Sequence, residues 1–315
     1  MSLVETFLNT LETTLPVFAM VFIGLGLRRL GWIDAGFINT ASTLVFKATL
    51  PTLVFLSIVR ADLNQTLNLP LILFFVAATL VGFLLCWLWA LKTVPVNDRG
   101  VFIQGAFRGN CGIVGLALAA NLYGDYGLSA GGLLLGVVII AYNTLSVVAL
   151  TAYQPDEKTS LKKVLADIAR NPLIVAVLIS IPVAWSGLEL PEWVMTSGDY
   201  FASLTLPLAL LCIGGTLSLK AMRDDRALAL NASVLKMIAL PFLCTFAGWL
   251  IGFEGRELGL MFLYFASPTA AASFVMVKAL GGNERLAANI VAMTTLAASL
   301  TITLGVFLLT TAGLI

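Results

Sequence analysis

An arginine and a helix-breaking sequence lie together inside a long apolar run. Residues 107–115 read FRGNCGIVG, in which Arg108 precedes Gly109, Asn110 and Cys111. Glycine and asparagine favour non-helical backbone, and a helix that resumes after a break presents free N–H groups and the positive end of its dipole to the gap. The planar guanidinium adds a full charge and a fork of donors that matches a carboxylate. The segment therefore predicts a site for an organic anion.

A second break lies near the end of the chain, where residues 266–271 read ASPTAA. Pro268 lacks an N–H and clashes with the preceding turn of a helix, while Ser267 and Thr269 offer hydroxyls to the freed backbone groups. Irregular backbone inside a membrane persists only where protein buries it or water reaches it. We therefore expect the two breaks to frame one binding site, with two unrelated kinks as the alternative.

The acidic residues give Arg108 no evident partner. All 17 of them lie in loops or near the ends of apolar runs, and the chain has no histidine. A charge inside a membrane is costly unless it is neutralised or hydrated, so we infer that the missing anion is the substrate. The alternative is that Arg108, about 13 Å below Arg99 at the helical rise, extends to the surface or caps backbone carbonyls.

Other polar side chains are candidates for the same site. Lys47, one turn before Pro51, either lines the cavity or faces solvent, and Asn143 is the best placed of the neutral candidates. A structural hydrogen bond between helices is an equally good interpretation of each neutral side chain. Lys236 is expected to extend to the membrane surface. The further neutral candidates are Gln104, Asn121, Thr144 and Tyr264.

Composition identifies the class of protein. Hydrophobic residues make up 59% of the 315 residues, charged residues 11%, and the mean hydropathy is +0.99, whereas soluble domains carry about 25% charge. The net charge of +1 predicts no nucleic-acid partner. The absence of histidine removes imidazole metal sites and bases, and the four cysteines, all inside apolar runs, read as buried apolar residues. The first apolar run ends in two arginines, so we expect a retained span and not a cleaved signal.

Apolar runs and basic loops predict the topology. A membrane helix needs about 20 apolar residues. The distribution of Lys and Arg is asymmetric, with thirteen in the loops after odd-numbered runs and two in the opposite loops. The positive-inside rule then places both termini outside and the basic linker 154–169 in the cytoplasm. The expected location of the protein is the inner (plasma) membrane. Ten candidate spans lie near 6–28, 35–59, 69–91, 99–122, 128–152, 170–187, 194–219, 229–252, 257–280 and 286–311.

The two halves of the chain match at a nearly constant offset. The tripeptide TLP at 49–51 recurs at 205–207, and short matches before it share the offset of about 156 residues. Because five spans are an odd number, two such repeats enter the membrane from opposite sides, as in many secondary transporters. The prediction is an all-α polytopic protein of ten transmembrane helices in two inverted five-helix repeats, 1–153 and 170–315, with helices four and nine broken at corresponding positions.

Several segments resemble the auxin efflux carrier (AEC) family, whose bacterial members are described as permeases for malate, malonate and other organic acids, and whose relatives include the plant PIN auxin exporters. The resemblance covers essentially the whole chain. It implies that broken helices four and nine cross, that spans one, two, six and seven form a scaffold and a homodimer, and that spans three to five and eight to ten form a mobile domain in an elevator mechanism. The matching segments are LPVFAMVFIGLGLRRLGWID (15–34), RGNCGIVGLAL (108–118), SPTAAASFVMVKALGG (267–282) and TTLAASLTI (294–302).

One departure from that family bears on the substrate. Plant members carry proline at both crossings, whereas here the first break reads Arg-Gly-Asn and only the second keeps a proline. This favours a small carboxylate held by Arg108 over auxin itself. The expected partners are thus a small carboxylate, membrane lipid and a second copy of the chain.

Three other functions are weighed against this one. A sodium-coupled symporter of the bile-acid type would hold its ion through backbone carbonyls and Asn, Ser or Thr oxygens at the breaks, so sodium is the one cofactor considered. A membrane receptor that never alternates access is the second, and would use the linker for a partner. An intramembrane enzyme is the weakest, because no nucleophile–base pair or metal cluster is evident.

Overall fold

The computed structural model describes residues 3–61, 68–153, 170–188, 190–217 and 226–315, and within them every element is helical. The basic linker expected at 154–169 lies outside the described residues. The elements of the first half are α1 (Leu3–Arg29), α2 (Ala35–Leu44), η1 (Val45–Thr49), α3 (Leu50–Arg60), α5 (Leu69–Thr93), η2 (Val96–Asp98), α6 (Arg99–Phe107), η3 (Cys111–Gly115) and α7 (Leu116–Thr151). The elements of the second half are α9 (Pro172–Ser186), α10 (Glu192–Ser203), α11 (Thr205–Thr216), α12 (Arg226–Val234), η5 (Leu235–Ala239), α13 (Leu240–Ile251), α14 (Gly255–Ala266), α15 (Ala272–Ala279) and α16 (Glu284–Thr311).

Polar caps mark where several of these helices begin. The side chains of Asp34, Asn68, Asn171 and Asn283 accept hydrogen bonds from the first-turn amides of α2, α5, α9 and α16. Such caps satisfy donors that have no partner inside the helix. At Gly124 the backbone leaves the helical region with φ of 55°, which glycine adopts without strain. α7 is therefore two helical segments joined by a kink.

Seven helices in the described part of the chain are long and apolar enough to cross a membrane. The structure thus supports an all-helical, multi-pass membrane protein. The predicted ten spans include segments below this length: α9 has 15 residues, and the spans expected at 99–122 and 257–280 are each divided by a break. The ten-span inverted repeat accordingly stays a prediction.

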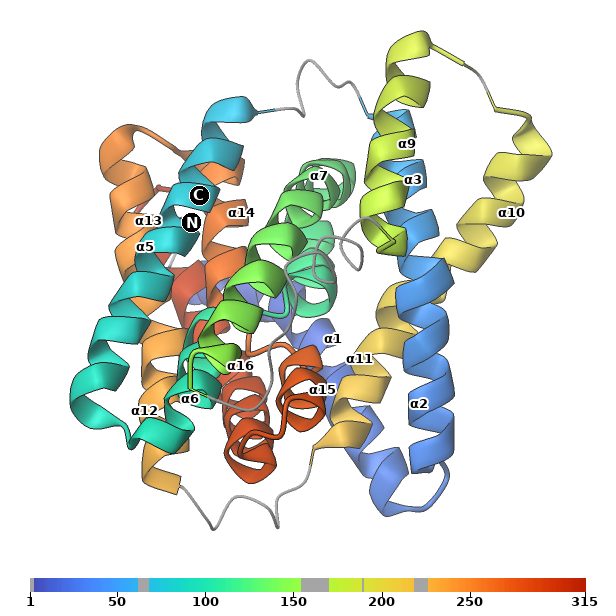
Figure 1. Ribbon diagram of the computed structural model, residues 1–315. Coiled ribbons are helices and arrows are strands. Elements are labelled where there is room, and N and C mark those ends of the chain that lie inside the picture. The colour runs from blue at the N-terminus through green and yellow to red at the C-terminus, as the bar shows by residue number, and fades with distance from the viewer. Residues whose placement is uncertain (1–2, 62–67, 154–169, 189, 218–225) are drawn as a thin grey trace.

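Two groups of helices flank α7 (Figure 1). On one side α1 packs against α11, and α3 packs against α9 and α10. On the other side α6 packs among α5, α7, α12 and α16, with α13 and α14 beside them. α6, η3 and α14 lie inside the second group and are largely buried, whereas α15 packs on α16 at its edge and leaves Val275 exposed.

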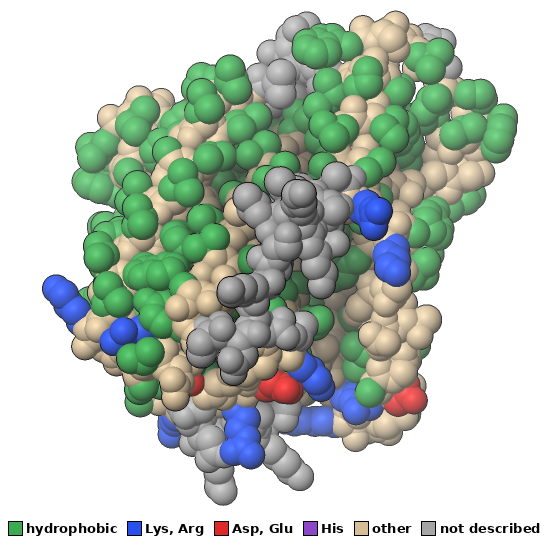
Figure 2. Space-filling model, in the orientation of Figure 1, with side chains coloured by type: hydrophobic (Ala, Val, Ile, Leu, Met, Phe, Trp, Pro, Cys, Tyr) green, Lys and Arg blue, Asp and Glu red, His purple; other side chains and the backbone are tan. Residues whose placement is uncertain are grey.

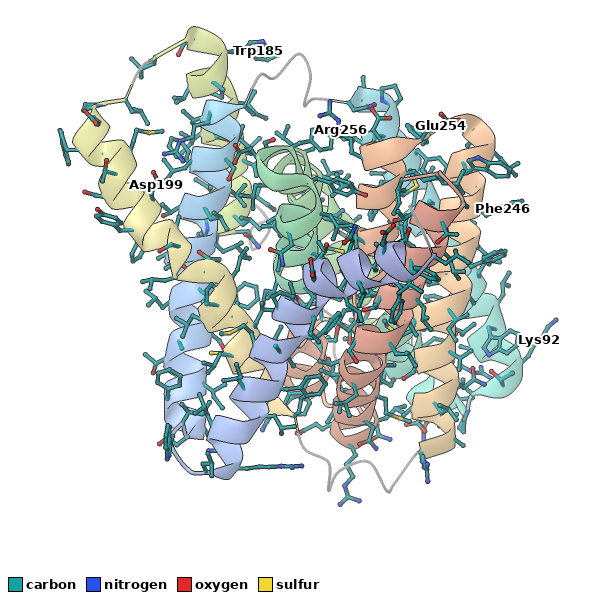
Figure 3. The ribbon with its side chains drawn as sticks, turned by 180° about the vertical axis from the view of Figure 1, so that it is seen from behind. Lys92, Trp185, Asp199, Phe246, Glu254 and Arg256 are labelled. Carbon is teal, nitrogen blue, oxygen red and sulfur yellow. The ribbon has the colours of Figure 1, made fainter. Side chains whose placement is uncertain are left out.

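Charge and apolar surface are separated on the outside of the molecule. On the face drawn in Figure 2, hydrophobic side chains cover most of the upper part, and most of the visible Lys and Arg side chains gather toward the lower end. Seen from behind, Trp185, Glu254 and Arg256 lie toward the upper end, while Lys92 lies lower (Figure 3). A broad apolar surface with charged side chains toward both ends, and an excess of Lys and Arg at one of them, is what a bilayer requires.

Proline produces a wider helical turn at two places. Leu50 and Leu240 each donate to the carbonyl five residues back, closing the π-helical turns η1 and η5. Each precedes a proline, Pro51 or Pro241, which lacks the N–H of the regular bond and clashes with the preceding turn. One extra residue in the turn relieves this clash. These turns carry Lys47 and Lys236.

Candidate functional site

The two breaks meet and are joined through their backbones. The N–H of Asn110 donates to the carbonyl of Pro268 at 2.7 Å, and the N–H of Ala270 donates to the carbonyl of Arg108 at 3.3 Å. This is an isolated antiparallel bridge, and every named element in the described residues is helical. Backbone groups that a break would leave unpaired in the membrane thus pair with each other. The expectation that the breaks lie together is confirmed.

Thr269 ties the bridge to two neighbouring helices. Its hydroxyl donates to the carbonyl of Gly105 at 2.7 Å, in the last turn of α6, and its N–H donates to the hydroxyl of Thr294 at 3.1 Å. Carbonyls in the last turn of a helix have no partner four residues on. Thr269 therefore completes the end of α6 from the opposite side of the crossing.

Close packing explains the glycine at the first break. A Cβ at Gly109 would lie 3.1 Å from Nζ of Lys236 and 3.2 Å from the carbonyl oxygen of Tyr264. Asn110 takes the non-helical backbone conformation, with φ −87° and ψ 55°, as its sequence position predicted. Gly112, by contrast, already lies within the helical turn η3.

The side chain of Arg108 is held by neutral groups. It is 8% exposed; Nη2 donates to Oδ1 of Asn143 at 2.8 Å, and Nη1 contacts Oγ of Ser146 at 3.3 Å and Sδ of Met276 at 2.6 Å. The salt bridges among the described residues are Arg60–Asp199 and Lys278–Glu284. Within the described part of the chain, the guanidinium therefore has no carboxylate partner.

A small cavity lies at the crossing itself. Its volume is about 80 Å³, and Arg108, Gly109, Asn110 and Cys111 line it together with Ala272, the first residue of α15, and the two alanines before it. η3 and α15 thus begin at its wall. The first N–H groups of a helix lack intrahelical partners and carry the positive end of the dipole, so both helix starts favour a negative group in this space.

A larger cavity of about 990 Å³ adjoins the small one, and both are lined by Arg108. Among its described lining residues, Arg28, Lys47 and Arg108 are cationic and none is acidic. Asn143 lines the same space. Of the two interpretations of Lys47, the one in which it faces the cavity is therefore supported.

The predicted site residues separate into two groups. Arg108, Gly109, Asn110, Cys111, Asn143 and Lys47 line the cavities. Ser267, Pro268 and Thr269 are absent from both linings; they build the crossing, and the Ser267 hydroxyl donates to the carbonyl of Leu263 in its own helix. The second group positions the first.

The prediction for Lys236 was wrong. Its side chain is 0% exposed, and Nζ donates to the carbonyl of Phe265 at 2.8 Å, beside the crossing. The helix that carries it is apolar on every side, so its sequence gives no indication of which face points inward. A lysine in the turn before a proline is the signal that could have drawn attention to it, since Lys47 lies four residues before Pro51 and Lys236 five residues before Pro241.

Three of the remaining polar candidates, Gln104, Asn121 and Tyr264, have partners within the protein and are absent from both cavity linings. The hydroxyl of Tyr264 donates to the carbonyl of Gly131 at 2.6 Å, and Nδ2 of Asn121 donates to the carbonyl of Thr13 at 3.1 Å. Nε2 of Gln104 contacts Sδ of Met276 at 3.5 Å. All four cysteines are free and buried, as expected. The described residues contain no cluster of three or more His, Cys, Asp or Glu side chains suited to a metal ion.

Comparison with known proteins identifies the family. The sequence profile of the family described as "Membrane transport protein" matches residues 9–306. The chain belongs to this family. The resemblance to AEC-type carriers is thereby confirmed at the level of the family, and a transporter family excludes the enzyme considered above.

Individual members are similar along most of their length. A protein of Methanothermobacter thermautotrophicus named "Uncharacterized transporter" is 25% identical over 86% of this chain and 88% of its own. A second protein described as an uncharacterized transporter, from Methanocaldococcus jannaschii, is 24% identical over 84% of this chain and 88% of its own. A protein of Rhizobium meliloti named "Putative malonate transporter" is 25% identical over 92% of both chains.

Proposed function

We propose that this member of the family carries a small organic anion, a mono- or dicarboxylate, across the membrane. The observation that carries the proposal is the cavity of about 990 Å³ that has three cations and no acid among its described lining residues. It leads to a guanidinium with no carboxylate partner in the described chain. The name of the Rhizobium meliloti relative favours malonate as the first substrate to test.

Arg108 would pair with the carboxylate. Asn143, which now accepts from Nη2, holds the guanidinium toward the cavity without neutralising it, and the starts of η3 and α15 offer N–H groups to the same anion. Lys47 and Arg28 would draw the anion into the larger cavity through their field. The site is thus built from one permanent charge, two helix starts and a basic entrance.

The movement we propose is of the elevator type. In this proposal α1, α2–α3, α9 and α10–α11 form the scaffold, and α5–α7 with α12–α16 form the transport domain, each drawn from both inverted repeats. The packing of α1 on α11 and of α3 on α9 supports a shared scaffold. The bridge between the two breaks supports a transport domain that moves as one body. A homodimer through the scaffold in the inner membrane completes the proposal.

Binding and transport measurements on Arg108 variants test this function. Loss of a charged hydrogen bond costs about 1.5–3 kcal/mol, which corresponds to roughly 10- to 150-fold weaker binding. We therefore expect malonate to raise the melting temperature of the purified wild-type protein, and Arg108→Gln to lose this shift together with uptake into proteoliposomes. Arg29→Gln, at an exposed arginine outside both cavity linings, is the matched control.

The result that contradicts the proposal is unchanged carboxylate binding and transport in Arg108→Gln. The same titration with sodium replaced by choline separates the competing functions. Strict sodium dependence would favour a symporter of the bile-acid type. Binding without movement of the anion across the membrane would favour a receptor.

A further inference from the structure

A second buried cation lies on the other side of the crossing from the cavities. Lys236 is fully buried, and its Nζ lies 2.8 Å from the carbonyl oxygen of Phe265 and near Gly109. It is absent from the linings of both cavities. The backbone of the first break therefore separates the ammonium from the proposed anion site, and Lys236 takes no direct part in substrate contact.

The ammonium occupies the negative end of a half-helix. Pro268 has no N–H to give to the carbonyl of Tyr264, and the N–H of Thr269 is directed to Thr294 instead of to Phe265. Two carbonyls at the end of α14 are therefore free of their regular helical partners. The Tyr264 carbonyl accepts from the thiol of Cys111 at 3.3 Å, and the Phe265 carbonyl accepts from Lys236.

The charge of this lysine is balanced by dipoles alone in the described part of the chain. Neither salt bridge among the described residues includes Lys236, and the hydrogen bond that Nζ makes goes to a backbone carbonyl, that of Phe265. Carbonyl oxygens at the C-terminal end of a helix carry partial negative charge. Unwound carbonyls and half-helix ends of this kind are where secondary transporters coordinate a coupling cation.

We propose that Lys236 supplies a tethered cation in the position where a coupling ion would bind, so that this protein binds its anion without sodium. The proposal rests on the proposed function, because it concerns the same crossing. The fixed ammonium stabilises the end of α14 in place of an ion, and it excludes a second cation by like-charge repulsion. Its field, added to that of Arg108, favours an anion beyond the Gly109 backbone.

Two variants of Lys236 test the proposal, with malonate as the probe and sodium exchanged for choline at constant ionic strength. Wild-type binding should be the same in both salts. Lys236→Ser removes the ammonium and leaves room beside the Phe265 carbonyl. We expect it to bind malonate at least roughly tenfold more weakly in choline, a change of about 1.4 kcal/mol, and to recover part of this affinity in sodium.

Lys236→Met is the matched control, because methionine fills the space of the aliphatic stem but carries no charge. It should bind malonate as weakly as Lys236→Ser in choline, without recovery in sodium. Malonate binding at wild-type strength by both variants in choline would overturn the proposal, as would sodium-dependent binding by the wild type.

A readout without substrate separates this proposal from the proposed function. In the absence of any carboxylate, sodium should raise the melting temperature of Lys236→Ser but not that of the wild type or Lys236→Met. If no carboxylate stabilises the wild type, the proposed function fails, while this sodium-specific shift still reports on the cation position. If the shift is absent from a folded Lys236→Ser protein, the tethered-cation proposal fails.

Discussion

The hydroxyl of Thr269 should contribute measurably to the stability of the crossing. It donates to the carbonyl of Gly105 at 2.7 Å, and both residues are buried. Thr269→Val keeps the shape of the side chain and removes the donor. A buried carbonyl left without a partner costs about 1–3 kcal/mol, so we expect the free energy of unfolding to fall by about that amount.

Thermal unfolding of the purified protein in detergent, followed by tryptophan fluorescence, measures this effect. The entropy of unfolding, about 2.1 cal/mol/K per residue, is roughly 0.66 kcal/mol/K for 315 residues, so 1 kcal/mol moves the midpoint by about 1.5 °C and we expect a fall of roughly 1.5–5 °C. Thr269→Ser retains the hydroxyl and should recover most of the loss.

Thr295→Val provides the matched control. Thr295 is also buried, and its hydroxyl donates to the carbonyl of Val291 at 2.7 Å. That carbonyl lies in the middle of α16 and accepts a regular helical bond as well, so loss of the hydroxyl leaves it satisfied. Equal midpoints for Thr269→Val and Thr295→Val would refute the role assigned to Thr269, as would a Thr269→Ser variant no more stable than Thr269→Val.

Two further substitutions have matched controls on the same chain. In Gly24→Ala the new Cβ would overlap the backbone carbonyl of Leu211 in α11, and because overpacking of this kind costs about 1–3 kcal/mol, we expect a lower melting midpoint. The control Gly26→Ala, with nothing within 4 Å of its Cβ, should gain about 0.5–1 kcal/mol from helix propensity. Equal melting midpoints for the two variants would contradict the close approach of α1 and α11. In Lys47→Gln the entrance of the larger cavity loses a cation, so the KM for malonate should rise a few-fold, more at low salt than at high salt. The control Lys92→Gln, at the exposed end of α5, should leave KM unchanged. An effect of Lys47→Gln on KM that is absent or independent of salt would exclude electrostatic guidance by this lysine.

Helix positions followed closely from the sequence because they depend on local composition. The run expected at 69–91 is α5 over Leu69–Thr93, and the run expected at 286–311 is α16 over Glu284–Thr311. The positions of both breaks could be predicted from glycine, asparagine and proline, since each of these residues disfavours helical backbone at its own position. The π-helical turns η1 and η5 were not predicted, although a proline inside an apolar run is the local cause of each.

Only those features of the site that depend on the position of a residue along the chain could be predicted from the sequence. The bridge shows that the two breaks meet, as their sequences predicted, whereas the internal repeat that suggested their correspondence stays a prediction. The direction in which a side chain points could not be predicted, because helices in a membrane are apolar on both their lipid and their protein faces. Lys236 therefore gave no sign that it turns inward, and the separation of cavity-lining residues from those that build the crossing also needed the structure.

The bridge between the breaks has a consequence for biogenesis. The backbone of Asn110 and Arg108 finds its partners in Pro268 and Ala270, which leave the ribosome long after the first half of the chain has entered the membrane. Until α14 is inserted, these polar groups have no protein partner at that depth, and hydrocarbon offers none. The first half of the molecule must therefore keep water or the insertion machinery at its break, and it reaches its final form only when the second half arrives.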